Sequence, residues 1–209
     1  MGFIRCNLRV LMAEHDYNIQ DVKDRTKLSR TTISNLANNN ATGVQYDTMV
    51  QLCEFFSCLP GDLFSYVDTS IDFEDITEEE ERNIDMNEDT FIADEDGNGE
   101  DYISSINTEC KICANIRYKN EQNKIIFNMS IEYRLNEDKD ITEVSAKISD
   151  NFIHELSRIN IPWYVKKYAK EKLSEFIMSF GFDTFSEEIE GESLGGIYID
   201  FSNGNKERF

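Results

Sequence analysis

Hydrophobic residues in the first quarter of the chain recur three and four positions apart, which predicts short amphipathic helices. Ile4, Leu8 and Leu11 share one face of a first helix that ends near Glu14. The stretch 18–36 divides into two helices joined by a tight turn, and the stretch 46–57 repeats the pattern with apolar residues at 49, 52, 53 and 56. Asn18 stands where its side chain can cap free backbone N–H groups.

From residue 108 onwards the apolar positions alternate with polar ones, which predicts β-strands with one buried face. A hairpin is expected over 112–135, with a turn at 120–123, followed by a third strand at 141–148. A short helix begins at Asp150 or Asn151, and a long one runs from Pro162 to Gly181, which is expected to end it. A last short strand covers 197–201. Residues 102–209 are therefore expected to form an α+β domain with an antiparallel sheet and a long helix.

Between these two regions lies an acidic segment, residues 68–101, with 16 acidic and 1 basic side chains. Residues 1–67 carry 7 acidic and 6 basic side chains, and residues 102–209 carry 18 and 14. A segment of low hydrophobicity and high net charge does not offset chain entropy by burial. We therefore expect an acidic, flexible or partly helical linker at 68–101 and a multidomain protein.

The second helix of the 18–36 stretch presents a short polar surface. Ser29 can cap it, Ile33 and Leu36 point inward, and the remaining residues point outward. An arginine can bind a guanine edge through two hydrogen bonds, an asparagine can do the same to adenine, and a threonine offers a hydroxyl and a methyl group. These residue types suit a helix that lies in the major groove of DNA. The outward set is Arg30, Thr31, Thr32 and Asn35.

The segments DVKDRT, KLSRTTISNL and YDTMVQLCEFFSCLPGDLFSYV together resemble the lambda-repressor-like (Cro or XRE-type) helix-turn-helix domain over about residues 3–67. This resemblance implies five helices, at about 4–14, 18–26, 29–37, 46–57 and 60–66, in an all-α domain. Lys27 replaces the usual turn glycine, which is expected to cost about 1 kcal/mol if the residue is left-handed.

The same resemblance implies which residues contact DNA. The base contacts would be Arg30, Thr31 and Asn35. The phosphate contacts would be Ser29 and Thr32 on the third helix, Gln20 on the second, and Asn38, Asn40 and Thr42 in the loop that follows. The alternative for the loop is a solvated connection without DNA contact, and the alternative for the whole region is a helical bundle used only for protein contact.

The second half of the chain has a resemblance of its own. The segment IPWYVKKYAKEKLSEFIMSFGFD is similar to the helix of SecB-like export chaperones, where a proline, a Tyr-Ala-basic-Glu step and a terminal Gly-Phe recur. That family oligomerises through sheets and helices and offers apolar grooves to protein chains. Only the analogy of fold is carried over to residues 102–209.

Charge and cysteine content limit the partners and the compartment. The net charge of −20 argues against strong nonspecific binding to nucleic acid, although the first 67 residues are near neutral. No apolar run approaches the roughly 20 residues of a membrane span, and no signal peptide is evident. Five cysteines, an odd number, fit reduced thiols. We expect a cytoplasmic protein with no membrane partner.

No pattern indicates catalysis, a metal or a cofactor. The two histidines, His15 and His154, lie in different predicted domains, and no serine or cysteine has a base partner in its sequence context. Cys110 and Cys113 fall within a predicted strand, where residues three apart face opposite sides. The run DEDGNG at 94–99 begins like a calcium loop, but Ser105 stands where the last ligand, a glutamate, belongs. We expect no enzyme, no metal site and no cofactor.

These expectations combine into one leading hypothesis. The protein would be a sequence-specific transcriptional regulator, a repressor of the phage or mobile-element type, that binds a palindromic double-stranded DNA operator as a homodimer or higher homo-oligomer. The carboxy-terminal domain would oligomerise it and could bind a protein inducer. The alternative is a chaperone-like or inhibitory protein-binding module whose helix-turn-helix only controls its own gene.

Overall fold

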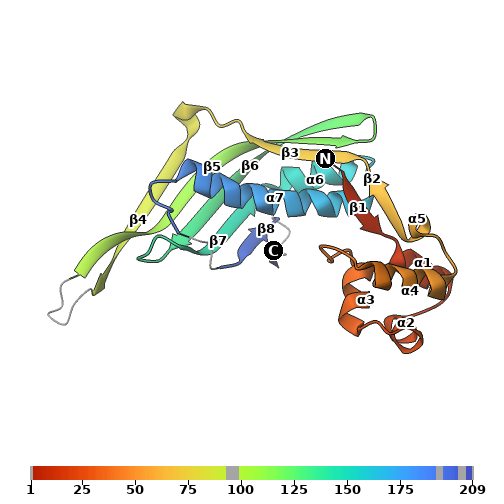
Figure 1. The fold of residues 1–209 in the computed structure, drawn as a ribbon. Helices are drawn as coiled ribbons and strands as arrows, with labels where there is room; N and C mark the ends of the chain where they lie inside the picture. Colours follow the sequence, from red (N-terminus) through yellow and green to blue (C-terminus); the bar gives the residue numbers. More distant parts are fainter. Residues whose placement is uncertain (1, 93–98, 192–194, 202–205, 209) are drawn as a thin grey trace. The chain divides into compact units, whose positions relative to one another are not determined.

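The chain folds into two compact units, Met1–Thr69 and Ser70–Phe209. The structure is a computed structural model, and it describes residues 2–92, 99–191, 195–201 and 206–208 (Figure 1). Within these residues, no helix is long and apolar enough to cross a membrane.

The first unit consists of five helices and a two-stranded sheet, so it is not all-α as expected. In chain order the elements are β1 (Phe3–Cys6), α1 (Leu8–Glu14), α2 (Ile19–Arg25), α3 (Arg30–Ala37), α4 (Tyr46–Phe56), α5 (Pro60–Leu63) and β2 (Phe64–Val67). Strands β1 and β2 pair antiparallel, from Phe3 opposite Val67 to Cys6 opposite Phe64. The core is formed by fully buried side chains from all five helices, among them Leu8, Val22, Ile33, Leu52 and Leu63.

The strands account for both errors in the expected helix bounds. The first helix was expected from Ile4, but residues 3–6 form β1, and the fifth was expected to reach residue 66, but it ends at Leu63 where β2 follows. Four residues are too few for the period of two to be separated from helical spacing. Strands β1 and β2 form only together, because each supplies the backbone hydrogen bonds that the other needs from a position about sixty residues away in the sequence.

A side chain in the loop after α3 holds this loop to β1. Asn39 has a left-handed backbone, with φ of 58°. Its side-chain Oδ1 accepts a hydrogen bond from the Cys6 N–H (2.6 Å), and its Nδ2 donates to the Cys6 carbonyl (3.1 Å). Asparagine is among the few residues that tolerate a left-handed backbone, so this position favours asparagine for two separate reasons.

The second unit is built on a seven-stranded sheet. Its elements are β3 (Thr69–Asp75), a 3-10 turn at Glu79–Glu81, β4 (Asn83–Ile92), β5 (Gly99–Tyr118), β6 (Glu121–Leu135), β7 (Ile141–Ile148), α6 (Asp150–Arg158), α7 (Trp163–Thr184), β8 (Ile197–Asp200) and β9 (Lys206–Arg208). The strand order is β3-β5-β6-β7-β8-β9, and β4 also pairs with β5. Strand β5 pairs antiparallel with β4 and with β6, as do β6 with β7 and β8 with β9, whereas β7 pairs parallel with β8.

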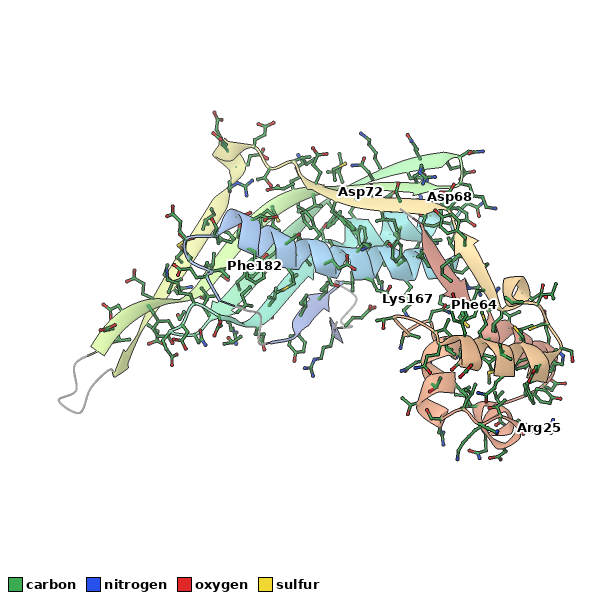
Figure 2. All side chains as sticks on the ribbon, in the orientation of Figure 1. Arg25, Phe64, Asp68, Asp72, Lys167 and Phe182 are labelled. Atoms are coloured by element: carbon green, nitrogen blue, oxygen red, sulfur yellow. The ribbon has the colours of Figure 1, made fainter. Side chains whose placement is uncertain are left out.

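The described residues of the acidic segment, 68–92 and 99–101, contribute strands to this sheet and do not form a flexible linker, which corrects the expected division at 68–101. In β3, Ile71 is buried while Asp72 and Glu74 are exposed, so these two charges stay in water while the apolar side chain packs. Asp72 is labelled in Figure 2. Strand β4 pairs with β5 over its whole length, from Asn83 opposite Glu109 to Ile92 opposite Gly99. Composition alone predicted disorder because the burial and pairing come from partners elsewhere in the chain.

Helices α6 and α7 lie against one face of the sheet (Figure 1), and their side chains form the core of the unit. The buried Tyr133 hydroxyl donates to the Ile177 carbonyl of α7 (2.6 Å). Gly181 lies against the same ring, where an added Cβ would stand 2.5 Å from a ring carbon of Tyr133. Gly181 was expected to end the helix, but α7 continues to Thr184. The glycine instead allows α7 to pack closely against the Tyr133 ring.

The cysteines of β5 are not positioned as a pair. The Cys110 thiol donates to the Met129 carbonyl, whereas the Cys113 thiol contacts the Asn115 side chain. Burial raises the pKa of the Cys110 thiol to about 12, with a smaller contribution from Asp75. No group of three histidine, cysteine or acidic side chains among the described residues could hold a metal ion. Of the calcium-like run, residues 94, 96 and 98 lie outside the described residues.

Candidate nucleic-acid interface

Helices α2 and α3 form the expected helix-turn-helix, and both begin with the predicted caps. The Asn18 side chain accepts from the N–H groups of Gln20 (2.8 Å) and Asp21 (3.1 Å), while the Asp21 carboxylate accepts from the Asn18 N–H (2.8 Å). The Ser29 hydroxyl accepts from the Thr32 N–H (3.0 Å). Such caps typically contribute about 1 kcal/mol each, and they fix where each helix begins.

The turn between α2 and α3 does not need a glycine. Thr26 is extended at the end of α2, with φ of −123°, and its hydroxyl donates to the Val22 carbonyl (2.8 Å) and accepts from the Leu28 N–H (3.3 Å). The N–H of Lys27 donates to the Gln51 side chain of α4 (3.0 Å). Lys27 is not among the described residues with positive φ, so the expected penalty for replacing glycine does not arise.

The three residues predicted to contact bases lie on one exposed surface of α3. Arg30 and Thr31 stand in the first turn, Asn35 lies one turn later, and all three are exposed. Within the described part of the chain, no hydrogen bond or ion pair is recorded for the side chains of Arg30, Thr31 or Asn35. Their polar groups are therefore available to an external ligand.

A hollow of about 370 Å³ brings several predicted residues together between α3 and the start of α4. Thr32 and Asn35 line it from α3, and Asn40 and Thr42 line it from the loop. The loop is held in place by the backbone, since the Asn40 N–H donates to the Asn35 carbonyl (2.8 Å). The structure thus places predicted base and phosphate contacts around one depression.

The remaining predicted phosphate contacts have partners within the unit. The hydroxyls of Ser29 and Thr32 are 2.8 Å apart, so one donates to the other. The Gln20 amide donates to the Asp24 carboxylate (2.7 Å) on the same helix. The half-buried Asn38 amide donates to the Ser34 hydroxyl (3.3 Å). Gln20 and Asn38 would have to share or exchange a hydrogen bond in order to bind a phosphate, whereas the acceptor of the Ser29–Thr32 pair still has its own hydrogen to donate.

The basic side chains of α2, α3 and the turn between them are not all equally available. Lys23, Lys27 and Arg30 are exposed. The guanidinium of Arg25, at the end of α2 (Figure 2), lies over the Tyr17 ring, 4.9 Å from its centre. This cation–π contact holds the side chain on the body of the unit.

Sequence reasoning missed several residues at this site. Asn39 fixes the loop through Cys6, as described above. Val44 and Gln45 line the same hollow as Asn40, and the adjacent Tyr46 is 82% exposed at the start of α4. The sequence signal for Tyr46 was its position as the first residue of the predicted helix that follows the loop.

Comparison with known proteins agrees with this geometry for the first unit. Residues 7–69 match the family of Cro/C1-type HTH DNA-binding domains. Over 60 residues the chain is 25% identical to the uncharacterized HTH-type transcriptional regulator YozG of Bacillus subtilis (strain 168), a match that covers 29% of this chain and 71% of that protein. No solved structure matches the chain. The helix-turn-helix prediction is confirmed, whereas the SecB-like resemblance of residues 102–209 finds no support.

Proposed function

We propose that this protein is a sequence-specific transcriptional regulator that represses its target as a dimer. The observation that carries the proposal is the exposed set Arg30, Thr31 and Asn35 on α3, within a Cro/C1-type helix-turn-helix domain. The role is one of binding, and it requires no cofactor, metal or catalytic group.

The chemistry of α3 suits readout in the major groove. Arg30 can donate two hydrogen bonds to guanine, Asn35 can pair with adenine through its amide, and Thr31 can place its methyl group against thymine. The helix has eight residues and is therefore about 12 Å long, which spans roughly four base pairs. So few base pairs give limited specificity, and this supports the proposal of two copies on a palindromic site.

Phosphate contacts would hold this helix in register. Asn40 and Thr42 are exposed in the loop beside α3. Of the bonded hydroxyls of Ser29 and Thr32, the acceptor keeps its own hydrogen, which can be donated to a phosphate oxygen. Gln20 and Asn38 would contribute by exchanging their present partners. Because the chain carries a net charge of −20, nonspecific affinity should be low.

The second unit would provide the contact between copies and could receive a protein inducer. Support for this comes from its open sheet. Helices α6 and α7 cover one face (Figure 1). A hollow elsewhere on the sheet is lined by polar side chains such as Asn107, Glu109, Glu132 and Lys147. Light scattering on the full chain tests the dimer, since one copy has a mass of 24.3 kDa. A particle of that mass at the concentrations that bind DNA would exclude the dimer.

The experiment for DNA reading is fluorescence anisotropy with the DNA upstream of the protein's own gene and with a scrambled duplex of equal length. The measured quantity is the ratio of the two affinities, at two salt concentrations. The wild type is expected to prefer the upstream duplex strongly. Arg30→Ala should lower this ratio by about fivefold or more, because a bidentate contact to guanine contributes roughly 1–3 kcal/mol of discrimination.

The matched control is Arg9→Ala, which removes the same charge from an exposed position on α1. It should leave the ratio unchanged, even if a lost phosphate contact weakens both affinities equally. Equal binding of both duplexes by the wild type would refute specific reading. An unchanged ratio in Arg30→Ala would refute the assigned role of α3.

A further inference from the structure

Two of the five cysteines lie together at the end of α4 and reach the surface. Cys53 and Cys58 are half-buried, whereas the other three cysteines are buried. Cys53 lies in the last turn of α4 and Cys58 two residues beyond its end. Both side chains pack at the edge of the core of the first unit.

The backbone between these cysteines follows a defined helix ending. Ser57 is left-handed, with φ of 51° and ψ of 42°. The N–H of Cys58 donates to the Cys53 carbonyl (3.0 Å), and the N–H of Ser57 donates to the Glu54 carbonyl (3.3 Å). This pair of bonds is the Schellman motif, in which the side chains at the two outer positions meet in an apolar contact. Here both outer positions are cysteines.

The electrostatics of Cys58 agree with this contact. Burial raises the pKa of the Cys58 thiol, and the neighbouring Cys53 thiol raises it further, both by its charge when ionised and through a hydrogen bond between the side chains. The Schellman geometry, in which the two outer side chains meet, is what brings the two thiols together, and the direction of the pKa shift agrees with it.

We propose that Cys53 and Cys58 form an intramolecular disulfide when the protein meets a hydroperoxide, so that the α4–α5 corner is a redox modification site. The inference rests on the fold of the first unit and does not depend on the proposed function. One sulfur attacks a peroxide oxygen; an S–O bond forms, the O–O bond breaks, and the thiol proton leaves with the other oxygen, as water from hydrogen peroxide or as an alcohol from an organic hydroperoxide. The second sulfur then attacks the sulfenic sulfur, forming the S–S bond and releasing water. Two electrons pass from the two thiols to the peroxide.

The bond would fasten two parts of the unit that are already joined by hydrogen bonds. Upstream of Cys53, Gln51 holds the helix-turn-helix turn through Lys27. Downstream of Cys58, the Leu63 carbonyl of α5 accepts from the Asn7 N–H (2.7 Å). A cross-link between the cysteines closes a short loop and removes freedom from the unfolded chain. Oxidation should therefore stabilise the first unit while leaving α3 exposed.

The test is treatment of the full-length native chain with hydrogen peroxide, followed by alkylation and peptide mapping by mass spectrometry without reductant. We expect a loss of two hydrogens, located in a peptide that links Cys53 to Cys58, and reversal by dithiothreitol. The thermal transition of the first unit should rise by several degrees in the oxidised protein. Cys53→Ala and Cys58→Ala should each show neither the link nor the rise.

Substitutions at the exposed Ser57 test whether the turn, and not merely the presence of two thiols, brings about the reaction. Ser57→Gly favours the left-handed turn and should keep or increase the rate of disulfide formation. Ser57→Val disfavours it and should slow the reaction several-fold, with both thiols still present. The proposal is overturned if peroxide yields only sulfinic or sulfonic acids at these cysteines, or if both variants oxidise at the wild-type rate.

Discussion

Asn39 offers a test of how the loop beside the recognition helix is held. In Asn39→Ala the two hydrogen bonds to Cys6, of 2.6 and 3.1 Å, are lost. Each contributes about 1 kcal/mol net. The left-handed backbone, with φ of 58°, costs alanine about 1 kcal/mol more. We therefore expect the free energy of unfolding of the first unit to fall by about 3 kcal/mol.

Two further variants separate these contributions. Asn39→Gly keeps the left-handed turn without strain and loses only the hydrogen bonds, so it should cost about 2 kcal/mol. Asn39→Asp keeps an acceptor for the Cys6 N–H but turns a second oxygen toward the Cys6 carbonyl. Only the protonated carboxyl can donate there, so its folded pKa is raised. The variant should therefore approach the wild type below the unfolded pKa of about 4 and lose stability as the pH rises through the folded pKa.

The assay is urea unfolding followed by circular dichroism, with amide hydrogen exchange of Cys6 as the local measurement. Exchange at Cys6 should accelerate at least about tenfold in Asn39→Ala, because its acceptor is lost. Equal unfolding midpoints for Asn39→Ala and the wild type, together with unchanged exchange at Cys6, would refute the assigned role.

Two predictions concern the second unit. Gly181→Ala should lower its stability by roughly 1–3 kcal/mol in urea, because the added Cβ meets the Tyr133 ring at 2.5 Å; an unchanged midpoint would show that the ring moves aside freely. Partial burial raises the pKa of Asp75. Hydrogen bonds from Thr77 and from the Arg82 guanidinium, which lies 2.5 Å away, lower this pKa by a larger amount, so the net shift is downward. Its contribution is therefore present above the unfolded pKa of about 3.9 and is lost as the pH falls through the folded value. Asp75→Asn should be less stable than the wild type at pH 7, and the difference should shrink in acid; a constant difference across the titration would contradict this.

The parts of the fold that could be predicted from the sequence are those whose causes are local. Helices α2 and α3 begin directly after their predicted caps, Asn18 and Ser29. These starts could be predicted because a cap acts within three residues of its own position. The hairpin of β5 and β6 followed from the alternation of apolar and polar residues, although its turn lies at residues 119–120 and not at 120–123 as predicted.

The parts that could not be predicted depend on distant partners. Strand β1 exists because of β2, and the acidic strands β3 and β4 exist because β5 lies beside them. At the candidate site, the exposed residues of α3 followed from helical spacing. Asn39 did not, because its role requires the Cys6 backbone thirty-three residues away.

The length of β5 has a consequence for how this protein can be divided. Residues 105–118 of this twenty-residue strand pair with β6 along one side, while β4 and β3 share the other side. A fragment that begins at residue 102, where the charge of the chain changes, would lose β3, β4 and the first residues of β5, and would leave one side of β5 open for its remaining length. The carboxy-terminal unit can therefore be transferred to another protein, or lost from this one, only together with its acidic strands. The negative charge of this unit therefore belongs to strands that its sheet requires.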